Sequence, residues 1–445
     1  MGFSFVFDQN LCVGCNACIL GCQFENSTLE MSWRKVRVFN DMKIPSIGVL
    51  NYSMACNHCE EAPCMRNCPA LAYSRDPKSG AVIIDKNKCI GCKYCTWNCP
   101  FDAPQYDSYK CVVEKCHFCN DKLKTGEKPA CISACVSGAL NIDEKIANVN
   151  NNSPGFSDIK IKPSIQIIPK RNPKGPKVYV QQSVDLDLNY ILNNDIKSSE
   201  KINQINEWSL WIFTSVMPIL VGIFYATAIN KFTVNAGLYI ALIIAPTLLG
   251  TLHLGKKSRA YRAIFNIKNS WLSREIFFFL LFSVLSTAFV LNIIPEITKY
   301  TGLISAFFLL LSADMLYKPA INRHRIHSSL GLISGVLYYS LFSENYVLFL
   351  IALIIKLVLY LYRKCFFLKT KLNILSQIFT IIRLGGAITI AFLIYKGMDS
   401  VLLLCSLVVV TELFDRFEFY IEIDIDTPER KINSDLIREI NKLNF

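Results

Sequence analysis

The chain has 445 residues, 52% of them hydrophobic, and a formal net charge of +12 from 47 lysine and arginine residues against 35 aspartate and glutamate residues. This apolar content exceeds that of an ordinary soluble protein, and the basic residues lie beside long apolar runs, so nucleic-acid binding is not expected. The chain opens with MGFSFVFDQN. This stretch lacks the basic and apolar regions of a secretory signal, so a secreted disulfide scaffold is not expected either.

Sixteen of the 19 cysteines fall into four groups within the first 135 residues. The first and third groups are spaced C-x2-C-x2-C-x3-C, the second C-x2-C-x4-C-x3-C and the fourth C-x2-C-x11-C-x3-C. The groups are Cys12, Cys15, Cys18, Cys22; Cys56, Cys59, Cys64, Cys68; Cys89, Cys92, Cys95, Cys99; and Cys116, Cys119, Cys131, Cys135. Three close thiolates with a more distant fourth are typical of bacterial ferredoxins, whereas structural zinc normally takes two separated pairs. The spacing therefore predicts four [4Fe–4S] clusters and a ferredoxin-like α+β domain over residues 1–140.

Three other residues of this region attract attention because they lie among the ligands. His58 and His117 stand inside C-x2-C pairs, where a hydrogen bond to sulfur is the expected role since no ligand is missing. Cys111 is expected to be a buried thiol that packs as a small hydrophobic residue.

The rest of the chain changes character after an Asn-, Lys- and Pro-rich segment at 141–207, which we interpret as a strap or linker. Long apolar runs then recur up to residue 423, and a polar tail follows at 424–445. Each run approaches the twenty residues or so that cross a bilayer. They predict an all-α bundle of eight transmembrane helices at 208–229, 236–255, 275–295, 301–318, 327–342, 345–362, 381–395 and 401–421.

The basic residues of the loops between these runs predict the orientation. With eight spans, one set of loops lies on the same face as both termini and is strongly basic. It carries Lys256, Lys257, Arg259, Arg262, Lys268, Arg274, Lys318, Arg323, Arg325, Arg363, Lys364, Lys369, Lys371 and Arg383, against Lys231, Lys299 and Lys396 on the other face. The bias places the cysteine-rich domain on the cytoplasmic face of a bacterial or archaeal cytoplasmic membrane.

Both halves of the chain resemble subunits of one family. The four cysteine groups, with FDAPQYD at 101–107, are similar to the iron–sulfur electron-transfer subunit of the DMSO reductase family of molybdopterin enzymes. The apolar half resembles the membrane anchor subunit of DMSO reductase, through GTLHLGKK at 250–257, SWLSREIF at 270–277, DMLYKP at 314–319 and ELFDRFEFY at 412–420. The chain therefore looks like a fusion of the two subunits.

The resemblance implies how the cysteines pair. The fourth cysteine of such a run usually binds the other cluster of a pair, and the first group is expected to pair with the last. The implied ligand sets are Cys12, Cys15, Cys18 with Cys135; Cys116, Cys119, Cys131 with Cys22; Cys56, Cys59, Cys64 with Cys99; and Cys89, Cys92, Cys95 with Cys68. Two ferredoxin-like halves follow, one inserted in the other.

The resemblance also implies an anchor that binds a quinol without haem. His253 is the expected hydrogen-bond partner of the quinol, with Asp314 or Glu412 in proton exit and Arg416 nearby. Other roles are open: Glu412 and Arg416 stand four residues apart and can form a salt bridge. Lys356, deeper in its span, either reaches toward the head groups or pairs with a carboxylate. Haem would need two axial histidines, and only His253, His324 and His327 follow the cysteine-rich region.

These inferences predict an electron-transfer and quinol-oxidising subunit that has no substrate-reducing site of its own. Electrons would pass from membrane quinol, menaquinol above all, to a large, separate molybdopterin subunit that reduces a sulfoxide, oxyanion or sulfur compound. Two alternatives stay open at this point. Electrons could flow in reverse, from a substrate such as sulfite or formate to quinone, or the chain could serve as a redox hub for a partner without molybdenum.

Overall fold

The computed structural model describes residues 2–28, 30–39, 49–144, 153, 155–156, 161–170, 207–230, 232–317, 327–367, 374–398, 400–422, 427–429, 431–432 and 434–435. The chain divides into two compact units. Unit 1 is made of Met1–Lys201 and Asp426–Phe445, and unit 2 of Ile202–Ile425. The predicted positions of His324, Lys318, Arg323, Arg325, Lys369, Lys371 and Lys231 lie outside the described residues.

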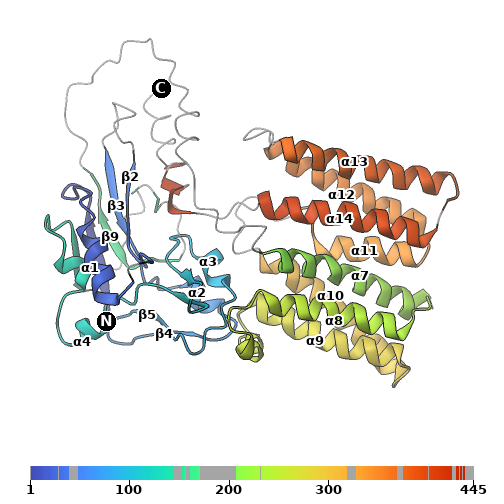
Figure 1. Ribbon diagram of the computed structural model, residues 1–445, viewed down its shortest axis with the longest axis horizontal. Coiled ribbons are helices and arrows are strands. Elements are labelled where there is room, and N and C mark those ends of the chain that lie inside the picture. Colours follow the sequence, from blue (N-terminus) through green and yellow to red (C-terminus); the bar gives the residue numbers. More distant parts are fainter. Residues whose placement is uncertain are drawn as a thin grey trace, which may run out of the picture. The chain divides into compact units, whose positions relative to one another are not determined.

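Unit 1 is built from short strands and short helices. Its three-stranded sheet has β1 (Phe3–Asp8) in the middle, antiparallel to β8 (Leu140–Glu144) and parallel to β9 (Ile165–Ile168). Three hairpins follow: β2 (Lys35–Phe39) with β3 (Leu50–Met54), β4 (Tyr73–Arg75) with β5 (Val82–Ile84), and β6 (Gln105–Asp107) with β7 (Val112–Glu114). The helices are α1 (Ala17–Asn26), α2 (Pro63–Arg66), α3 (Tyr94–Asn98), α4 (Asn120–Lys124) and α5 (Ala130–Ser133) (Figure 1).

Two local features bring the first and last cysteine groups together. In β1 the alternation of FSFVFD places Phe5 and Phe7 on one face, and both are buried. Helix α1 lies against α5 at Gly21, where an added Cβ would stand 2.6 Å from the Cβ of Ala134. Only glycine permits this close approach, which carries Cys22 of α1 toward Cys131 of α5.

The two ends of unit 1 contain segments that the sequence assigned to a strap and a tail. Within the strap at 141–207, β9 completes the sheet beside β1. Within the tail, the Asp435 carboxylate accepts a hydrogen bond from the Gly155 backbone N–H at 2.8 Å, and Glu429 pairs with Arg37. These contacts explain why the end of the chain lies in unit 1.

Unit 2 is helical throughout the part that the structure describes. Its helices are α7 (Trp208–Asn230), α8 (Ala236–Leu252), α9 (Trp271–Val290), α10 (Pro295–Leu316), α11 (Gly331–Phe342), α12 (Tyr346–Phe367), α13 (Ile374–Tyr395) and α14 (Val401–Glu422). A 3₁₀ helix, η1 (Lys257–Ile264), follows α8 and turns from it by 106°. Figure 1 shows α7 to α14 side by side with their axes roughly aligned.

Each of the eight predicted segments coincides with a helix, but fewer helices qualify as membrane spans. Among the described residues, five are long and apolar enough to cross a membrane: α7, α9, α10, α12 and α13; the bent pair of α8 and η1 would make a sixth. Helix α11 has 12 residues and a length of about 18 Å, which is shorter than the hydrocarbon core of about 30 Å. Helix α14 carries five charged residues between Glu412 and Glu422.

Helix boundaries also differ from those expected. The sequence predicted a span at 275–295, but α9 ends at Val290 and α10 begins at Pro295. Proline lacks the N–H of an interior helical residue but suits the first turn. Asn292 and Ile294 take positive φ values of 61° and 46° in the turn between the two helices. The predicted span at 381–395 is longer, since α13 begins at Ile374.

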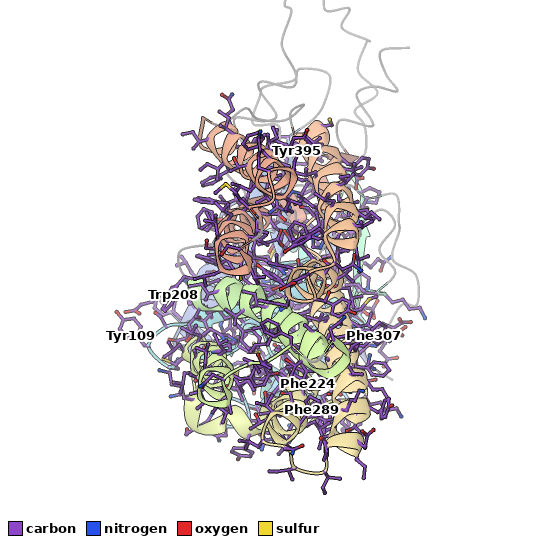
Figure 2. All side chains as sticks on the ribbon, turned by 90° about the vertical axis from the view of Figure 1, so that its right-hand side faces the viewer. Tyr109, Trp208, Phe224, Phe289, Phe307 and Tyr395 are labelled. Carbon is purple, nitrogen blue, oxygen red and sulfur yellow. The ribbon has the colours of Figure 1, made fainter. Side chains whose placement is uncertain are left out.

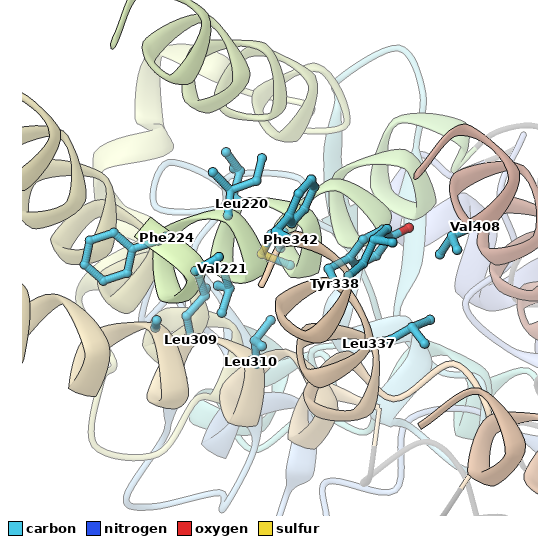
Figure 3. Packing of buried hydrophobic residues seen from close by; sticks show 14 of the residues in the cluster. Leu220, Val221, Phe224, Leu309, Leu310, Leu337, Tyr338, Phe342 and Val408 are labelled. Carbon is cyan, nitrogen blue, oxygen red and sulfur yellow. The ribbon is translucent and has the colours of Figure 1, made fainter. Parts of the chain in front are cut away.

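The core of unit 2 joins α7, α10, α11 and α14. Leu220, Val221 and Phe224 of α7 pack against Leu309 and Leu310 of α10, Leu337, Tyr338 and Phe342 of α11, and Val408 of α14 (Figure 3). The Phe224 ring also meets Phe289 of α9, with ring centroids 5.7 Å apart (Figure 2). Gly222 permits this packing, because an added Cβ would lie 2.5 Å from the Tyr338 Cβ.

Candidate functional site

Four cavities in unit 1 are each lined by four cysteines. Three of the four come from one sequence group and the fourth comes from another group. The Cys12 cavity is lined by Cys12, Cys15, Cys18 and Cys135; the Cys116 cavity by Cys116, Cys119, Cys131 and Cys22; the Cys56 cavity by Cys56, Cys59, Cys64 and Cys99; and the Cys89 cavity by Cys89, Cys92, Cys95 and Cys68. The cavities therefore bring together the cysteines of each crossed set.

The cavities suit a polynuclear cluster better than a single ion. Their volumes are about 320, 280, 340 and 300 Å³ in the order just given, including space open to solvent. Zinc holds four thiolates at about 2.3 Å from one point. Among the described residues, however, no three His, Cys, Asp or Glu side chains are arranged to hold one metal ion. Four soft donors around a larger space fit an iron–sulfur cube.

A shared backbone feature turns the cysteines toward the cavities. The third residue of the first C-x2-C loop in each group has a positive φ: Gly14 at 71°, His58 at 43°, Gly91 at 70° and Phe118 at 69°. Glycine adopts this left-handed conformation freely, whereas His and Phe do so at a cost of about 1–3 kcal/mol. The reversal lets both flanking sulfurs face the same cavity.

Burial disfavours the charged thiolate form of these cysteines unless a cation lies nearby. Burial, together with the neighbouring Cys131 thiol, raises the pKa of the Cys22 thiol to about 12. Metal binding deprotonates such thiols outright. Backbone N–H groups already point at several sulfurs: Gly91 and Val113 donate to Cys89 at 3.4 and 3.5 Å, and Phe118 donates to Cys116 at 3.4 Å.

Arg34 is a buried cation that the sequence did not single out. Its guanidinium lines the Cys116 cavity, and Nη1 donates to the Ser53 hydroxyl at 3.0 Å. That hydroxyl lies 3.2 Å from the Cys18 Sγ of the Cys12 cavity. Arg34 precedes β2 in a stretch of mixed polar and apolar residues, so only its tertiary position reveals that it links two cavities.

The three unassigned residues of this region have different surroundings. Burial, with the nearby Lys115 charge, lowers the pKa of His58 well below its ordinary value, so the ring is neutral. His58 lies 3.7 Å from the Cys116 Sγ. The His117 ring meets Trp33 edge-on. Cys111 is half-buried, not buried as expected, and its thiol donates to the Ser108 carbonyl at 3.3 Å.

In unit 2, Asp314 caps a helix. Its carboxylate accepts hydrogen bonds from the Gly331 N–H at 2.6 Å and the Leu332 N–H at 3.1 Å. These are N–H groups at the start of α11, which have no partner within the helix. Asp314, at the end of α10, therefore fixes the start of α11, a role that the sequence did not predict.

Glu412 belongs to a buried ion-pair network. Its carboxylate lies 2.8 Å from Lys356 Nζ of α12 and 2.8 Å from Arg383 Nη1 of α13. Lys356 is fully buried and also donates to the Ser328 carbonyl and the Ser334 hydroxyl at 2.6 and 2.7 Å. Of the two roles expected for Lys356, pairing with a carboxylate is the one observed. Glu412 makes its ion pairs with neighbouring helices and not with Arg416 on its own helix.

The network continues along α14 at Asp415 and Glu418. Asp415 lies 3.1 Å from Arg363 and 3.6 Å from Arg383, while Glu418 pairs with Lys364. The sequence placed Arg363, Lys364 and Arg383 in basic loops. They lie instead within α12 and α13, buried against carboxylates. Three of the residues used for the orientation argument thus have a packing role inside the bundle.

The remaining candidates occupy two places. Arg416 donates to the Thr214 carbonyl at 3.4 Å and interacts electrostatically with Asp314 and Glu275. Arg416, Asp314 and Glu275 of α9 are therefore near enough for their charges to interact. His253 is half-buried at the end of α8, directly before the turn into η1.

The buried ion pair predicts a measurable effect on stability. A Glu412→Gln variant leaves Lys356 and Arg383 without their shared anion, which costs about 3–5 kcal/mol. We expect a markedly lower unfolding temperature in detergent, followed by circular dichroism. The double variant Glu412→Gln with Lys356→Met also removes the Lys356 charge, while Arg383 keeps Asp415 as a partner, so it should recover much of the lost stability. Glu344→Gln, at an exposed turn, serves as the control. Unchanged unfolding of the single variant would contradict the pairing.

Comparison with known proteins agrees with the cysteine-lined cavities. Residues 48–145 match a family model described as a 4Fe–4S dicluster domain. The chain is 34% identical to the B component of the sulfite dehydrogenase of Allochromatium vinosum over 158 residues, covering 31% of this chain and 66% of the relative. It is 34% identical to the B component of the anaerobic dimethyl sulfoxide reductase of Escherichia coli over 154 residues, covering 32% and 75%.

A third relative is matched along nearly its full length. The B component of the polysulfide reductase of Wolinella succinogenes is 33% identical over 183 residues, which are 38% of this chain and 95% of the relative. The matches confirm the resemblance that the cysteine groups predicted. The protein belongs to the family of iron–sulfur subunits that includes those of dimethyl sulfoxide and polysulfide reductases, and its apolar C-terminal helices fit a fused membrane anchor.

Proposed function

We propose that this chain transfers electrons between membrane quinol and a separate molybdopterin-containing catalytic subunit. The observation that carries the proposal is the set of four cavities, each lined by four cysteines drawn from two sequence groups. The sixteen cysteines would hold four [4Fe–4S] clusters, each of which supplies a site for one electron when bound. Electrons would run from menaquinol toward a sulfoxide, oxyanion or sulfur compound, in keeping with the names of two relatives, dimethyl sulfoxide reductase and polysulfide reductase.

The chain's own residues set the solvent exposure, the hydrogen bonds and the charge around the clusters. Eleven of the sixteen cysteines are buried, which limits the access of water to the cavities, whereas Cys15 of the Cys12 cavity is exposed. Backbone N–H groups and the Arg34 guanidinium offset the negative charge of thiolates. Hydrogen bonds to sulfur and nearby charge are the means by which a protein sets reduction potentials.

In the membrane half, we propose eight spans and a quinol site that includes His253. The eight helices α7 to α14 occur at the predicted segments, which supports this count although α11 is short. Oxidation of a quinol releases protons, and a histidine can accept one. His253 remains the candidate for this role. Asp314 and Glu412 are the candidates for proton exit, with Arg416 near Asp314.

One observation favours a second direction of electron flow. The sulfite dehydrogenase relative is as similar to this chain as the dimethyl sulfoxide reductase relative is. A dehydrogenase partner would send electrons from its substrate toward quinone. Both directions use the same cysteines, and they differ only in the partner and in the relative potentials at the two ends.

The ligand sets predict which variants lose the same cluster. In the crossed ligand sets, Cys99 binds the same cluster as Cys59, although Cys99 belongs to the same sequence group as Cys92. A Cys99→Ala variant should lose or alter the same EPR signal as Cys59→Ala, and Cys92→Ala a different one. Cys111 lines none of the four cavities, so Cys111→Ala should keep the full iron content. A Cys99→Ala signal that matches Cys92→Ala would contradict the crossing.

If His253 belongs to the quinol site, its loss should slow cluster reduction by quinol and leave reduction by dithionite unchanged. In a His253→Ala variant, we expect a menaquinol analogue to reduce the clusters more slowly by roughly a hundredfold, near the lower range for a positioned acid or base. Dithionite should still reduce all clusters. Thr251→Ala is the matched control, since the Thr251 hydroxyl donates to Leu248 in its own helix. Reduction by the quinol analogue at the normal rate would remove His253 from the site.

The partner distinguishes the proposed function from a hub without molybdenum. The complex would be purified anaerobically in mild detergent, and its subunits and metals would be identified by mass spectrometry. We expect a large second subunit and stoichiometric molybdenum. A partner that contains only flavin or iron would support the redox-hub alternative instead. Adding sulfite or formate to the complex, and following cluster reduction, would then test the reverse direction.

A further inference from the structure

Two polar side chains of unit 1, Lys115 and His58, lie where the Cys56 and Cys116 cavities approach each other. Lys115 is the neighbour of Cys116 in sequence, yet its Nζ lies 3.5 Å from the Sγ of Cys56. His58 stands between Cys56 and Cys59 in sequence, yet its Nε2 lies 3.7 Å from the Sγ of Cys116. Lys115 thus enters the Cys56 cavity from the loop of the other group, and His58, which also lines the Cys56 cavity, directs Nε2 at a sulfur of the Cys116 cavity.

Lys115 carries its charge where solvent does not reach. The residue is 2% exposed and lines the Cys56 cavity. Its Nζ donates to the Cys116 carbonyl at 3.0 Å, to the Val82 carbonyl and to the Cys56 Sγ. Three acceptors match the three N–H donors of an ammonium group. The surroundings of Lys115 are therefore those of a fixed cation directed at one sulfur.

His58 directs a defined donor at the Cys116 sulfur. Its Nδ1 accepts a hydrogen bond from the Val82 N–H at 2.9 Å, so in the neutral ring the hydrogen lies on Nε2, which faces Cys116. The ring stacks on Phe118, with centroids 4.7 Å apart and an interplanar angle of 16°. This stack fixes the ring orientation.

The backbone at His58 and Phe118 indicates that the arrangement has a function beyond loop reversal. The equivalent positions of the other two loops are Gly14 and Gly91, which reach positive φ without strain. His58 and Phe118 reach it at φ values of 43° and 69°. Bulky residues in this conformation are uncommon and concentrate at functional sites.

We propose that Lys115 and His58 form a reciprocal bridge that sets the reduction potentials of the clusters in the Cys56 and Cys116 cavities. This inference rests on the proposed iron–sulfur ligation. Reduction adds one negative charge to a cluster. A cation or a hydrogen-bond donor at a cysteine sulfur favours the more negative state, more strongly in a buried site of low dielectric constant. Lys115 therefore raises the potential in the Cys56 cavity, and His58 raises it in the Cys116 cavity.

The position of the bridge gives it a further consequence. The two cavities belong to different ferredoxin-like halves, so an electron that visits all four clusters must cross between the halves. Higher reduction potentials of the clusters in the Cys56 and Cys116 cavities favour the presence of the electron on these two clusters.

The test is an EPR-monitored redox titration of the full chain with its partner, in which the clusters are assigned from the Cys59→Ala and Cys119→Ala signals. In Lys115→Met, we expect the midpoint potential of the Cys56-cavity cluster to fall. The shift should correspond to at least a tenfold change in its reduced-to-oxidised ratio, which is about 59 mV for one electron. The other clusters should shift less. Lys110→Met removes a charge from the same unit, but the Lys110 side chain is 55% exposed, so no comparable shift is expected.

Two further variants separate the contributions. Lys115→Gln keeps a hydrogen-bond donor and removes the charge, so it should lower the same potential as Lys115→Met. In His58→Asn, asparagine can adopt the left-handed backbone, but the ring that donates to the Cys116 sulfur is lost. This variant should therefore lower the potential of the Cys116-cavity cluster.

Iron analysis of the wild-type complex distinguishes failure of the inference from failure of the proposed function. Wild-type protein without iron would overturn the ligation itself. Wild-type protein with full iron, together with unshifted potentials in all three variants, would overturn the bridge alone. Loss of the Cys56-cavity cluster from both Lys115 variants would show that Lys115 serves assembly, and it would also overturn the role in setting the potential.

Discussion

Four sulfurs that face one cavity impose the constraint on which unit 1 depends. In the first C-x2-C loop of each group the backbone must reverse direction so that both sulfurs point inward, and the third residue of that loop takes a positive φ in all four groups. Most of the thiols that face inward are buried, and burial disfavours their thiolate form. A nearby cation offsets this cost, which is consistent with the buried positions of Arg34 and Lys115 beside the cavities.

Unit 2 meets a similar constraint with a different solution. Charged residues inside an apolar bundle are costly unless they are paired. Buried ion pairs line one side of α14, where the carboxylates of Glu412, Asp415 and Glu418 meet the cations Lys356, Arg363, Lys364 and Arg383. The network holds α12 and α13 against α14, and Asp314 holds the start of α11. These charged residues of the spans therefore have a structural role before any role in quinol chemistry is considered, and His253 lies at the end of α8.

Sequence reasoning succeeded where the signal was local. Cysteine spacing and apolar runs predicted the ferredoxin-like 4Fe–4S domain and the helical region that follows it, and both are observed. It failed where a residue's role depended on distant partners. Arg383 was counted with a basic loop although it stands at the start of the predicted span 381–395, whereas α13 begins at Ile374 and Arg383 pairs with Glu412 inside the bundle. Likewise, nothing near Lys115 in sequence indicates that its ammonium reaches Cys56.

The sequence by itself determined which residues can bind soft metal ions, which segments form helices, and where the chain changes from polar to apolar. These properties follow from spacing and periodicity, which act over a few residues. Only the tertiary structure decided which cysteines share a cavity, which carboxylate neutralises which cation, and that the end of the chain joins unit 1. Such pairings depend on contacts between residues that are far apart in the chain, and they are selected by the cost of leaving a buried charge or sulfur without a partner.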